Sequence, residues 1–372
     1  MATQLLCENG ACSGSGGPGC APQTYSINGQ ASITGSASIT SGAYFFSDGP
    51  EDLYDSTTNT YYLADPPNAS SGYWLLKESV AGGCHLFLWH GNNTGYTVNS
   101  QVLLYNPNSF TVTVIVPNYG AGTGFANGVD MWFQYWSSSS VSYSVASGGY
   151  LAVPVISISN IANGDVYGVV AQLQFQDPSG NPATMTVYDL AYISNDSTAF
   201  TQAPNSTNGV RGMANGFWVP INVSLTIATA SVPVDASLVT QFTCAATGDS
   251  LGGSDVPTVT GPGGSTYSLN GCFGCQLYVS LTVTNGDPSN AHSFVISVGC
   301  LPNNSPVEFA IDYTAGPGGC DSINNGTGLT SGEYLNIISD TLAAGANATY
   351  QFQLTSGGGY STPLAVGVTV TA

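Results

Sequence analysis

Nine cysteines are the side chains of this 372-residue chain best suited to chemistry, because a thiolate binds metals, exchanges electrons or forms disulfides. Three of them, Cys7, Cys12 and Cys20, lie in the Gly- and Ser-rich stretch LLCENGACSGSGGPGC near the N-terminus. Cys84 stands alone in the middle of the first half. Nine is an odd number of cysteines, so pairing within one chain under oxidising conditions leaves thiols that can pair with a second chain. The remaining five follow residue 240: Cys244, Cys272, Cys275, Cys300 and Cys320.

The motif CFGC at residues 272–275 has the spacing of half a zinc site, which the other cysteines after residue 240 would complete. A redox motif would stand at a helix start beside a parallel sheet, and the surrounding sequence is not of that kind. Loop-rich, strand-like segments around these thiols favour structural disulfides. We therefore expect the five cysteines to form disulfides within their own domain, without a metal.

The stretch GCHLFLWHGNNTG at residues 83–95 brings two histidines close in sequence to Cys84. Its apolar, aromatic character predicts a strand, and residues five apart on a strand face opposite sides. His85 and His90 would therefore not converge on one metal ion. We expect strand residues with Cys84 packed in the core.

Carboxylates gather in SDGPEDLYDSTTNTYYLADPP at residues 47–67. Oxygen ligands on a flexible loop suit calcium, but the spacing does not match an EF-hand loop and a solvated acidic turn explains the run as well. The sequence pairs no two of these carboxylates across a cleft, and it identifies no base for a serine or cysteine nucleophile. We expect no enzyme and no cofactor.

Charge is scarce throughout the chain and almost entirely negative. Charged residues make up 6% of the sequence, the only cations are Lys77 and Arg211, and the formal net charge is −19. Such a surface does not neutralise phosphates, which argues against nucleic acid and anionic membranes as partners. No basic segment leading into an apolar one is visible in the first twenty residues, and no apolar run reaches the roughly 20 residues that span a bilayer.

Segments such as SFTVTVIV (109–116) and LYVSLTVTN (277–285) are rich in β-branched residues and bounded by Asn, Pro and Gly, which predicts an all-β fold. An internal repeat with an offset of 184 residues joins Phe110 to Phe294 and Tyr150 to Tyr334. It further matches 27–39 with 221–232, 128–136 with 306–314, 150–175 with 334–354, and 183–193 with 363–372. We predict two tandem antiparallel β-sandwiches, immunoglobulin-like or jelly-roll, that repeat one fold. The predicted parts are an N-terminal arm (1–22), domain 1 (23–193), a linker (194–212) and domain 2 (213–372).

A Gly/Ser tether behaves as a flexible coil, so the thiols of Cys7, Cys12 and Cys20 are able to reach a neighbouring subunit. Disulfides between subunits would use the leftover thiols, whereas a disordered or internally bridged tail is the alternative. A Cys-rich N-terminal connector ahead of β-sandwich strands, with no visible leader, resembles the endospore appendage fibre subunits of spore-forming bacteria. That resemblance implies that Cys7, Cys12 and Cys20 belong to a connector whose disulfides join subunits along a fibre.

These observations predict a structural subunit of a self-assembling extracellular filament or surface layer on a spore, cell or virion. Its partner would be further copies of itself, joined by β-sheet contacts and disulfides. The alternative is a surface adhesin or glycan-binding module that uses the 40 aromatic residues (21 Tyr, 14 Phe, 5 Trp), with glycans as partners. A third hypothesis is an acid-stable hydrolase with carboxylates from residues 47–67. We expect an extracellular location reached without a recognisable signal peptide.

Overall fold

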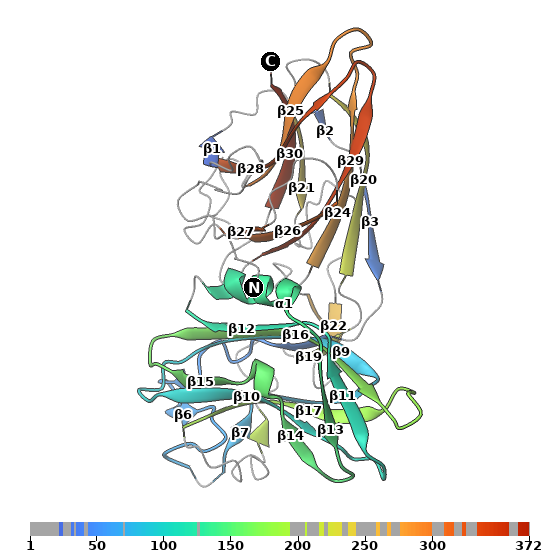
Figure 1. Cartoon of the computed structure of the whole chain (residues 1–372). Helices are drawn as coiled ribbons and strands as arrows, with labels where there is room; N and C mark the ends of the chain where they lie inside the picture. The colour runs from blue at the N-terminus through green and yellow to red at the C-terminus, as the bar shows by residue number, and fades with distance from the viewer. Residues whose placement is uncertain are drawn as a thin grey trace. The chain divides into compact units, whose positions relative to one another are not determined.

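The computed structural model describes most of the first half of the chain and the strands of the second half (Figure 1). The described backbone comprises residues 22–24, 31–32, 35–40, 44–69, 71–124, 127–193, 205–206, 216–218, 222–232, 237–242, 258–260, 266–268, 276–299, 309–315, 322–324, 333–356 and 364–371. Side chains are described at 44–69, 71–124, 131–193, 279–299, 311, 336–353, 355 and 366–369. The prediction of an all-β fold is confirmed.

The chain divides into two units. The first unit contains Ser41–Ile221 and Pro257–Ser268, and the second contains Met1–Thr40, Asn222–Val256 and Leu269–Ala372. Each unit has two main sheets that are largely antiparallel; β4 adds a parallel pairing to the first unit, and β20 and β2 add two to the second.

In the first unit, one sheet has the order β13-β11-β16-β9-β4-β19 and the other has the order β14-β10-β17-β8. Strand β12 joins the first sheet on β16, and β15 joins the second on β10. The elements of this unit are β4 (Tyr44–Ser47), β5 (Tyr54–Asp55), β6 (Thr60–Tyr61), β7 (Tyr73–Trp74), β8 (Leu76–Ala81), β9 (Gly83–Gly91), β10 (Val98–Tyr105), β11 (Val112–Val116), β12 (Tyr119–Thr123), α1 (Asn127–Ser137), β13 (Val141–Val145), β14 (Tyr150–Ala152), the 3₁₀ turn η2 (Pro154–Ile156), β15 (Ile158–Ile161), β16 (Val166–Gln176), β17 (Thr184–Tyr192), β18 (Asn205–Ser206), β19 (Gly216–Trp218), β22 (Thr258–Thr260) and β23 (Thr266–Ser268).

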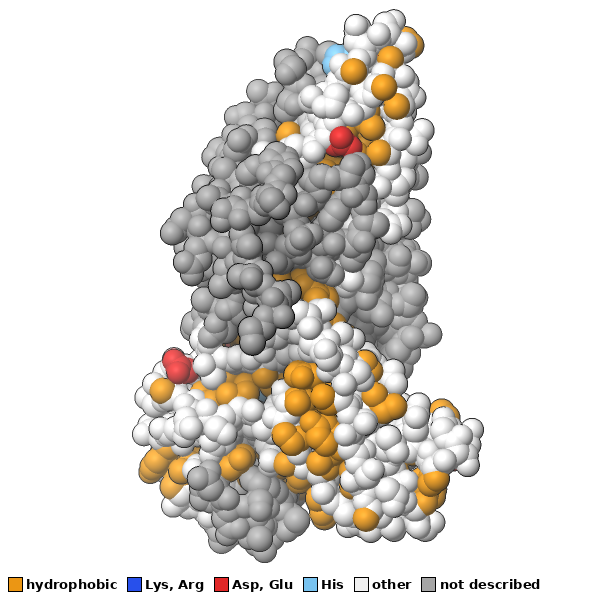
Figure 2. All heavy atoms as spheres, viewed as in Figure 1, with side chains coloured by type: hydrophobic (Ala, Val, Ile, Leu, Met, Phe, Trp, Pro, Cys, Tyr) orange, Lys and Arg blue, Asp and Glu red, His pale blue; other side chains and the backbone are white. Residues whose placement is uncertain are grey.

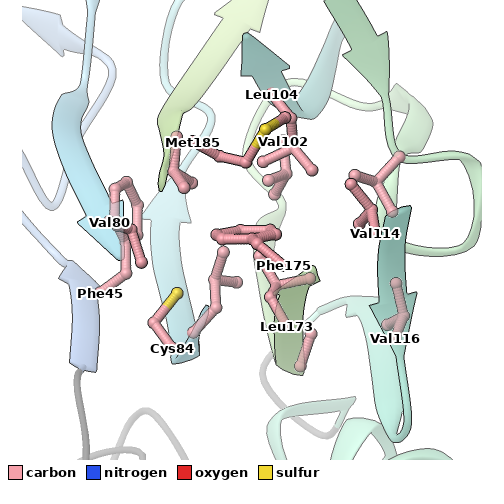
Figure 3. Close-up of a cluster of buried hydrophobic side chains, with 14 of the residues drawn as sticks. Phe45, Val80, Cys84, Val102, Leu104, Val114, Val116, Leu173, Phe175 and Met185 are labelled. Atoms are coloured by element: carbon pink, nitrogen blue, oxygen red, sulfur yellow. The ribbon is translucent and has the colours of Figure 1, made fainter. Parts of the chain in front are cut away.

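The core of this unit lies between its two sheets. Alternate residues of β11 and β17 point inward, which is the period of two expected of a half-buried strand. Phe175 of β16 and Met185 of β17 point toward one another from opposite sheets (Figure 3). Each such fully buried apolar side chain contributes about 1.5–3 kcal/mol relative to exposure. A chain with two cations forms few salt bridges, so hydrophobic burial supplies stability in their place.

In the second unit, the two sheets have the orders β1-β28-β25-β30-β21-β2 and β27-β26-β29-β24-β20-β3. The C-terminal strand β30 pairs with β21 on one side and β25 on the other, so it lies inside the sheet of its own unit. The strands of this unit are β1 (Pro22–Thr24), β2 (Ala31–Ser32), β3 (Gly35–Thr40), β20 (Asn222–Val232), β21 (Ser237–Phe242), β24 (Gln276–Asn285), β25 (His292–Gly299), β26 (Phe309–Ala315), β27 (Ser322–Asn324), β28 (Glu333–Leu342), β29 (Asn347–Ser356) and β30 (Leu364–Thr371).

The two units pair their strands in the same order. Eight positions correspond between the two units in chain order. In the first unit they are β8, β9, β10, β11, β13, β14/β15, β16 and β17, and in the second they are β21, β24, β25, β26, β27, β28, β29 and β30. In each unit, the strand that precedes this series pairs parallel with the second strand of the series: β4 with β9, and β20 with β24. Eight antiparallel strands divided in this way form a jelly roll. We call the units the first and second jelly rolls; their shared order supports the predicted repeat.

Three matches of the predicted repeat are wrong. Phe110 precedes β11, which corresponds to β26, whereas Phe294 lies in β25, which corresponds to β10. The segment 27–39 does not occupy the first jelly roll, because β3 pairs antiparallel with β20 in the second. The segment 128–136 lies within helix α1, whereas its partner 306–314 contains strand β26. The division of the chain also differs from the predicted boundary after residue 22, since β1, β2 and β3 join the sheets of the second jelly roll. The boundary differs because β1, β2 and β3 pair with segments far away in the sequence, and a local sequence pattern does not encode such pairing.

Helix α1 forms where β-prone aromatic residues predict a strand. Its buried residues include Met131, Trp132 and Tyr135, and they recur at the spacing of one helical face. The helix lies against β12 and β16, where two glycines permit close approach. A Cβ at Gly120 would lie 1.7 Å from the Met131 carbonyl oxygen, and one at Gly168 would lie 2.9 Å from the Met131 sulfur. Tertiary packing therefore overrides local propensity here.

Candidate functional site

Cys84 is the one cysteine among the described residues, and it lies in the core with 2% exposure and no disulfide. Burial raises the pKa of its thiol, so the reactive thiolate is suppressed. This agrees with the expected packed cysteine. The eight other cysteines named above, the tether thiols among them, lie outside the described residues.

The two histidines of strand β9 serve different surroundings. His85 stacks on Tyr44 with ring centroids 5.3 Å apart and lies 6.1 Å from the Trp132 ring. His90 is fully buried and contacts Asp189 of strand β17 in the opposite sheet. They do not converge, as the strand geometry predicts. Among the described residues, no group of three His, Cys, Asp or Glu side chains is placed to hold a metal ion.

His90 has a hydrogen-bond acceptor at each ring nitrogen. Nε2 lies 2.9 Å from Asp189 Oδ2, and Nδ1 lies 2.8 Å from the Pro50 carbonyl oxygen. A carbonyl and a carboxylate only accept, so both nitrogens carry protons and His90 is an imidazolium. Burial lowers the pKa of His90, but the charge and hydrogen bond of Asp189 outweigh it and the net shift is upward. The pair is therefore a buried ion pair between sheets.

Ser47 completes the residue types of a Ser-His-Asp triad, but the geometry differs. Ser47 Oγ lies 3.4 Å from His90 Nε2, the same nitrogen that contacts Asp189. In a triad, the acid and the nucleophile contact different nitrogens of the histidine. All three side chains are also fully buried, out of reach of a substrate. The group therefore joins the two sheets of the sandwich. The sequence held a signal for it, because Asp189 occupies an inward position of TMTVYDLAY after Met185 and Val187.

The carboxylates of residues 47–67 have separate local roles. Asp55 Oδ1 accepts the Thr57 N–H at 2.9 Å, and Asp65 Oδ1 accepts the Ile193 N–H at 2.7 Å. Asp48 is partly buried near His90, and desolvation raises its pKa to about 7. These contacts order turns and strand ends, and the burial of Asp55 and the desolvation of Asp48 differ from a fully solvated acidic turn.

An aromatic surface on the sheet β14-β10-β17-β8 is the most accessible candidate site. We call Trp74, Lys77, Tyr105, Tyr150 and Tyr188 the aromatic platform. The rings of Tyr105 and Tyr150 have centroids 4.7 Å apart, and those of Trp74 and Tyr188 lie 6.5 Å apart. The Lys77 ammonium lies 5.0 Å from the Trp74 ring and 5.4 Å from the Tyr188 ring. The sequence shows how many aromatic residues there are, but it does not show this grouping, because the grouping depends on strand register.

Comparisons with known proteins give no family for the chain. No protein-family model and no curated protein match it. Its structural neighbours include Penaeus vannamei nodavirus (11% identity, TM-score 0.18, 91% of this chain and 98% of that chain) and Macrobrachium rosenbergii nodavirus (10%, 0.16, 99% and 98%). Paenibacillus xanthan lyase is another (10%, 0.17, 91% of this chain), of which the chain spans 25%. At these TM-scores, no neighbour carries an argument about function. No helix in the described part of the chain has the length and apolarity to cross a membrane.

Proposed function

We propose that the chain is a structural subunit of a self-assembling protein shell or surface layer, such as the outside of a virion, spore or cell. The observation that carries this proposal is the tandem of two units with one jelly-roll strand order. Jelly rolls recur in viral capsid and lectin domains and in cupins. The step from this fold to a shell subunit is an analogy at the level of architecture.

The N-terminal segment 1–40, called the arm from here on, supplies a way for subunits to join. Its strands β1, β2 and β3 form three outer edges of the second jelly roll, pairing with β28, β21 and β20. Only residues 41–43 separate β3 from β4 of the first jelly roll. The same backbone hydrogen bonds would form if a neighbouring subunit donated these strands, because an exchanged element keeps its contacts. Exchange of the arm would thus link subunits while covering sheet edges that otherwise invite aggregation.

Disulfides would then make the links permanent. Cys7, Cys12 and Cys20 precede β1 by 2 to 15 residues, so a donated arm carries them to the neighbour. A covalent link adds resistance to dissociation more than strength of initial contact, since ordering a flexible segment costs about 1–2 kcal/mol per residue. The proposal gives the chain no catalytic role, makes further copies its partner and places it outside the cell.

A mixed-label crosslinking experiment tests the exchange. Gln23 of β1 pairs with Tyr334 of β28, so a photoreactive benzoylphenylalanine at position 23 would contact that strand. The modified light chain is denatured together with unmodified ¹⁵N-labelled chain, refolded, assembled and irradiated. Peptides joining a light arm to a heavy β28 are expected. Light-to-light peptides alone would show that each arm stays on its own subunit and would remove the exchange from the proposal.

A further inference from the structure

Strand register places four residues of the aromatic platform on one face of a single sheet, and Trp74 of the neighbouring strand β7 lies against Tyr188. Tyr150 of β14 stands directly opposite Tyr105 of β10, and Lys77 of β8 stands directly opposite Tyr188 of β17. Directly opposed side chains lie on the same face of a sheet and about 5 Å apart. The core residues Val102 and Leu104 of β10 and Val187 of β17 lie on the opposite face of the same sheet. The platform therefore points away from the sandwich core.

Part of this face is already packed and part is open. Leu103 and Leu190 are buried beneath Trp74, Tyr188 and neighbouring residues. Tyr150 is 48% exposed, more than any other large hydrophobic side chain in the described part of the chain. Hydrophobic side chains also gather in patches on the face drawn in Figure 2, where few charged side chains and no lysine or arginine are in view. The open part thus offers flat rings to solvent on a rigid sheet.

Lys77 gives the platform a positive charge that is exceptional in this chain. It is one of two cations against 21 acidic residues. Its side chain is exposed, and its ammonium lies over the Trp74 and Tyr188 rings. No ion pair with a carboxylate is formed by Lys77 within the described residues. An ammonium held by rings keeps its ability to attract an anion.

The phenols of the platform remain hydrogen-bond donors. Desolvation, followed by neighbouring tyrosines, raises the pKa of Tyr150 and of Tyr188. Both hydroxyl groups are therefore protonated at neutral pH. Ser79 and Thr186, which pair across β8 and β17 in the row next to Lys77 and Tyr188, add hydroxyls. Rings, hydroxyls and one cation are combined on one surface.

We infer that the aromatic platform binds a short saccharide that carries a carboxylate, such as a uronic acid oligomer. The apolar faces of pyranose rings would stack on Tyr105 and Tyr150, the hydroxyls would bond the phenols, and the carboxylate would pair with Lys77. The net charge of −19 does not oppose a short ligand, because salt screens charges beyond about 8 Å at physiological ionic strength. This inference is independent of the proposed shell role.

Titration calorimetry with trigalacturonate tests the site, with maltotriose as the neutral probe and triglutamate as the acidic peptide probe. Saturable binding of trigalacturonate is expected, with much weaker binding of the other two. Lys77→Gln should lower the affinity for trigalacturonate by about tenfold, because it removes the charge and keeps most of the stem. Tyr150→Ala should lower it by a similar factor. Tyr96→Ala is the matched control, since Tyr96 is 41% exposed in a separate ring cluster with Tyr61.

Several outcomes would overturn the inference. These are the absence of saturable binding, equal binding of maltotriose or triglutamate, or an unchanged affinity in Lys77→Gln. Tryptophan fluorescence shows whether each variant is folded, because all five tryptophans lie within Ser41–Ile221. If Tyr150→Ala misfolds, Tyr150→Ser and the Lys77 variant decide the result. None of these titrations depends on assembly, so their failure leaves the shell proposal standing.

Discussion

Asn92 and Asn285 hold the same position in the two jelly rolls. Asn92 follows strand β9, and its side-chain amide donates to the carbonyls of Tyr96 at 2.8 Å and Ile161 at 2.9 Å. Its backbone N–H donates to the Asp165 carbonyl at 2.7 Å. The side chain is buried and joins the β9–β10 connection to the turn between β15 and β16.

Asn285 ends strand β24 and repeats these bonds in the second jelly roll. Its amide donates to the carbonyls of Asn290 at 2.8 Å and Leu342 at 3.1 Å, and its N–H donates to the Ala346 carbonyl at 2.9 Å. Because β9 corresponds to β24 and β15 to β28, the two asparagines join equivalent loops. Equivalent side-chain bonds add to the shared strand order as support for the repeat.

Asn92→Ala is expected to destabilise the first jelly roll by about 3 kcal/mol, because it leaves two buried carbonyls without their donor. Denaturant unfolding followed by tryptophan fluorescence measures this. Asn68→Ala is the matched control, since Asn68 is exposed and donates one bond, to the Asn59 carbonyl. The control should stay within about 0.5 kcal/mol of the parent. Equal effects of the two substitutions would contradict the role given to Asn92.

The first jelly roll should be more stable in mild acid than in mild base. The pKa of His90 is raised, so the stability from its pair with Asp189 is complete below its unfolded pKa and is lost as pH rises through its folded pKa. The pKa of Asp48 is raised to about 7, so the folded state binds the extra proton and loses stability as pH rises from about 4 to about 7. Both effects have the same sign. Unfolding free energy should fall by on the order of 3 kcal/mol between about pH 5 and about pH 8.

Asp48→Asn separates the two contributions, because the amide imitates the protonated carboxyl. The variant should lose the part of the pH dependence below about pH 7 and keep the part due to His90. Glu51→Gln removes a neighbouring negative charge that raises the pKa of Asp48, so it should move the Asp48 part of the profile to lower pH and leave the His90 part in place. A profile that rises from mild acid to mild base would show that the assigned protonation states are wrong.

The sequence carries enough local pattern to predict most strands. In β11 and β17, alternate apolar residues mark an inward face, and the structure places them there. The same period correctly separates His85 from His90 on β9. It also identifies the equivalence of 150–175 with 334–354 and of 183–193 with 363–372, which contain corresponding strands.

Features that depend on distant partners escape such patterns. His90 and Asp189 are 99 residues apart, and only the packing of the sheet that contains β9 against the sheet that contains β17 brings them together. Helix α1 forms through packing at Gly120 and Gly168, against the β-propensity of its aromatic residues. The arm strand β3 looks like other strands, and its partner β20 lies some 185 residues away.

Trypsin should cut the folded chain only after Arg211. Lys77 is exposed, but its backbone lies within β8 paired to β17, and cleavage would require opening that sheet. Arg211 lies in the predicted linker, outside the described residues. Because β3 pairs with β20, fragments 1–211 and 212–372 should co-elute on gel filtration and separate only in denaturant. Fragments that separate without denaturant would contradict the pairing of the arm.

The tether thiols should link subunits. Non-reducing denaturing electrophoresis of assembled material is expected to show a ladder that collapses to one chain of 38.0 kDa with reductant. Replacing Cys7, Cys12 and Cys20 by Ser should abolish the ladder and leave tryptophan fluorescence unchanged. A single band at monomer mass without reductant, or tether thiols that alkylate freely in the assembly, would exclude these links.

Electron microscopy of the purified full-length chain, with its mass measured by sedimentation under the same conditions, tests the structural role most directly. The account predicts regular particles or sheets built from many copies, each copy showing two jelly rolls in the reconstructed map. These assemblies should form without added protein or nucleic acid. A chain that stays a folded monomer over a wide range of concentration, pH and oxidising conditions would contradict the account.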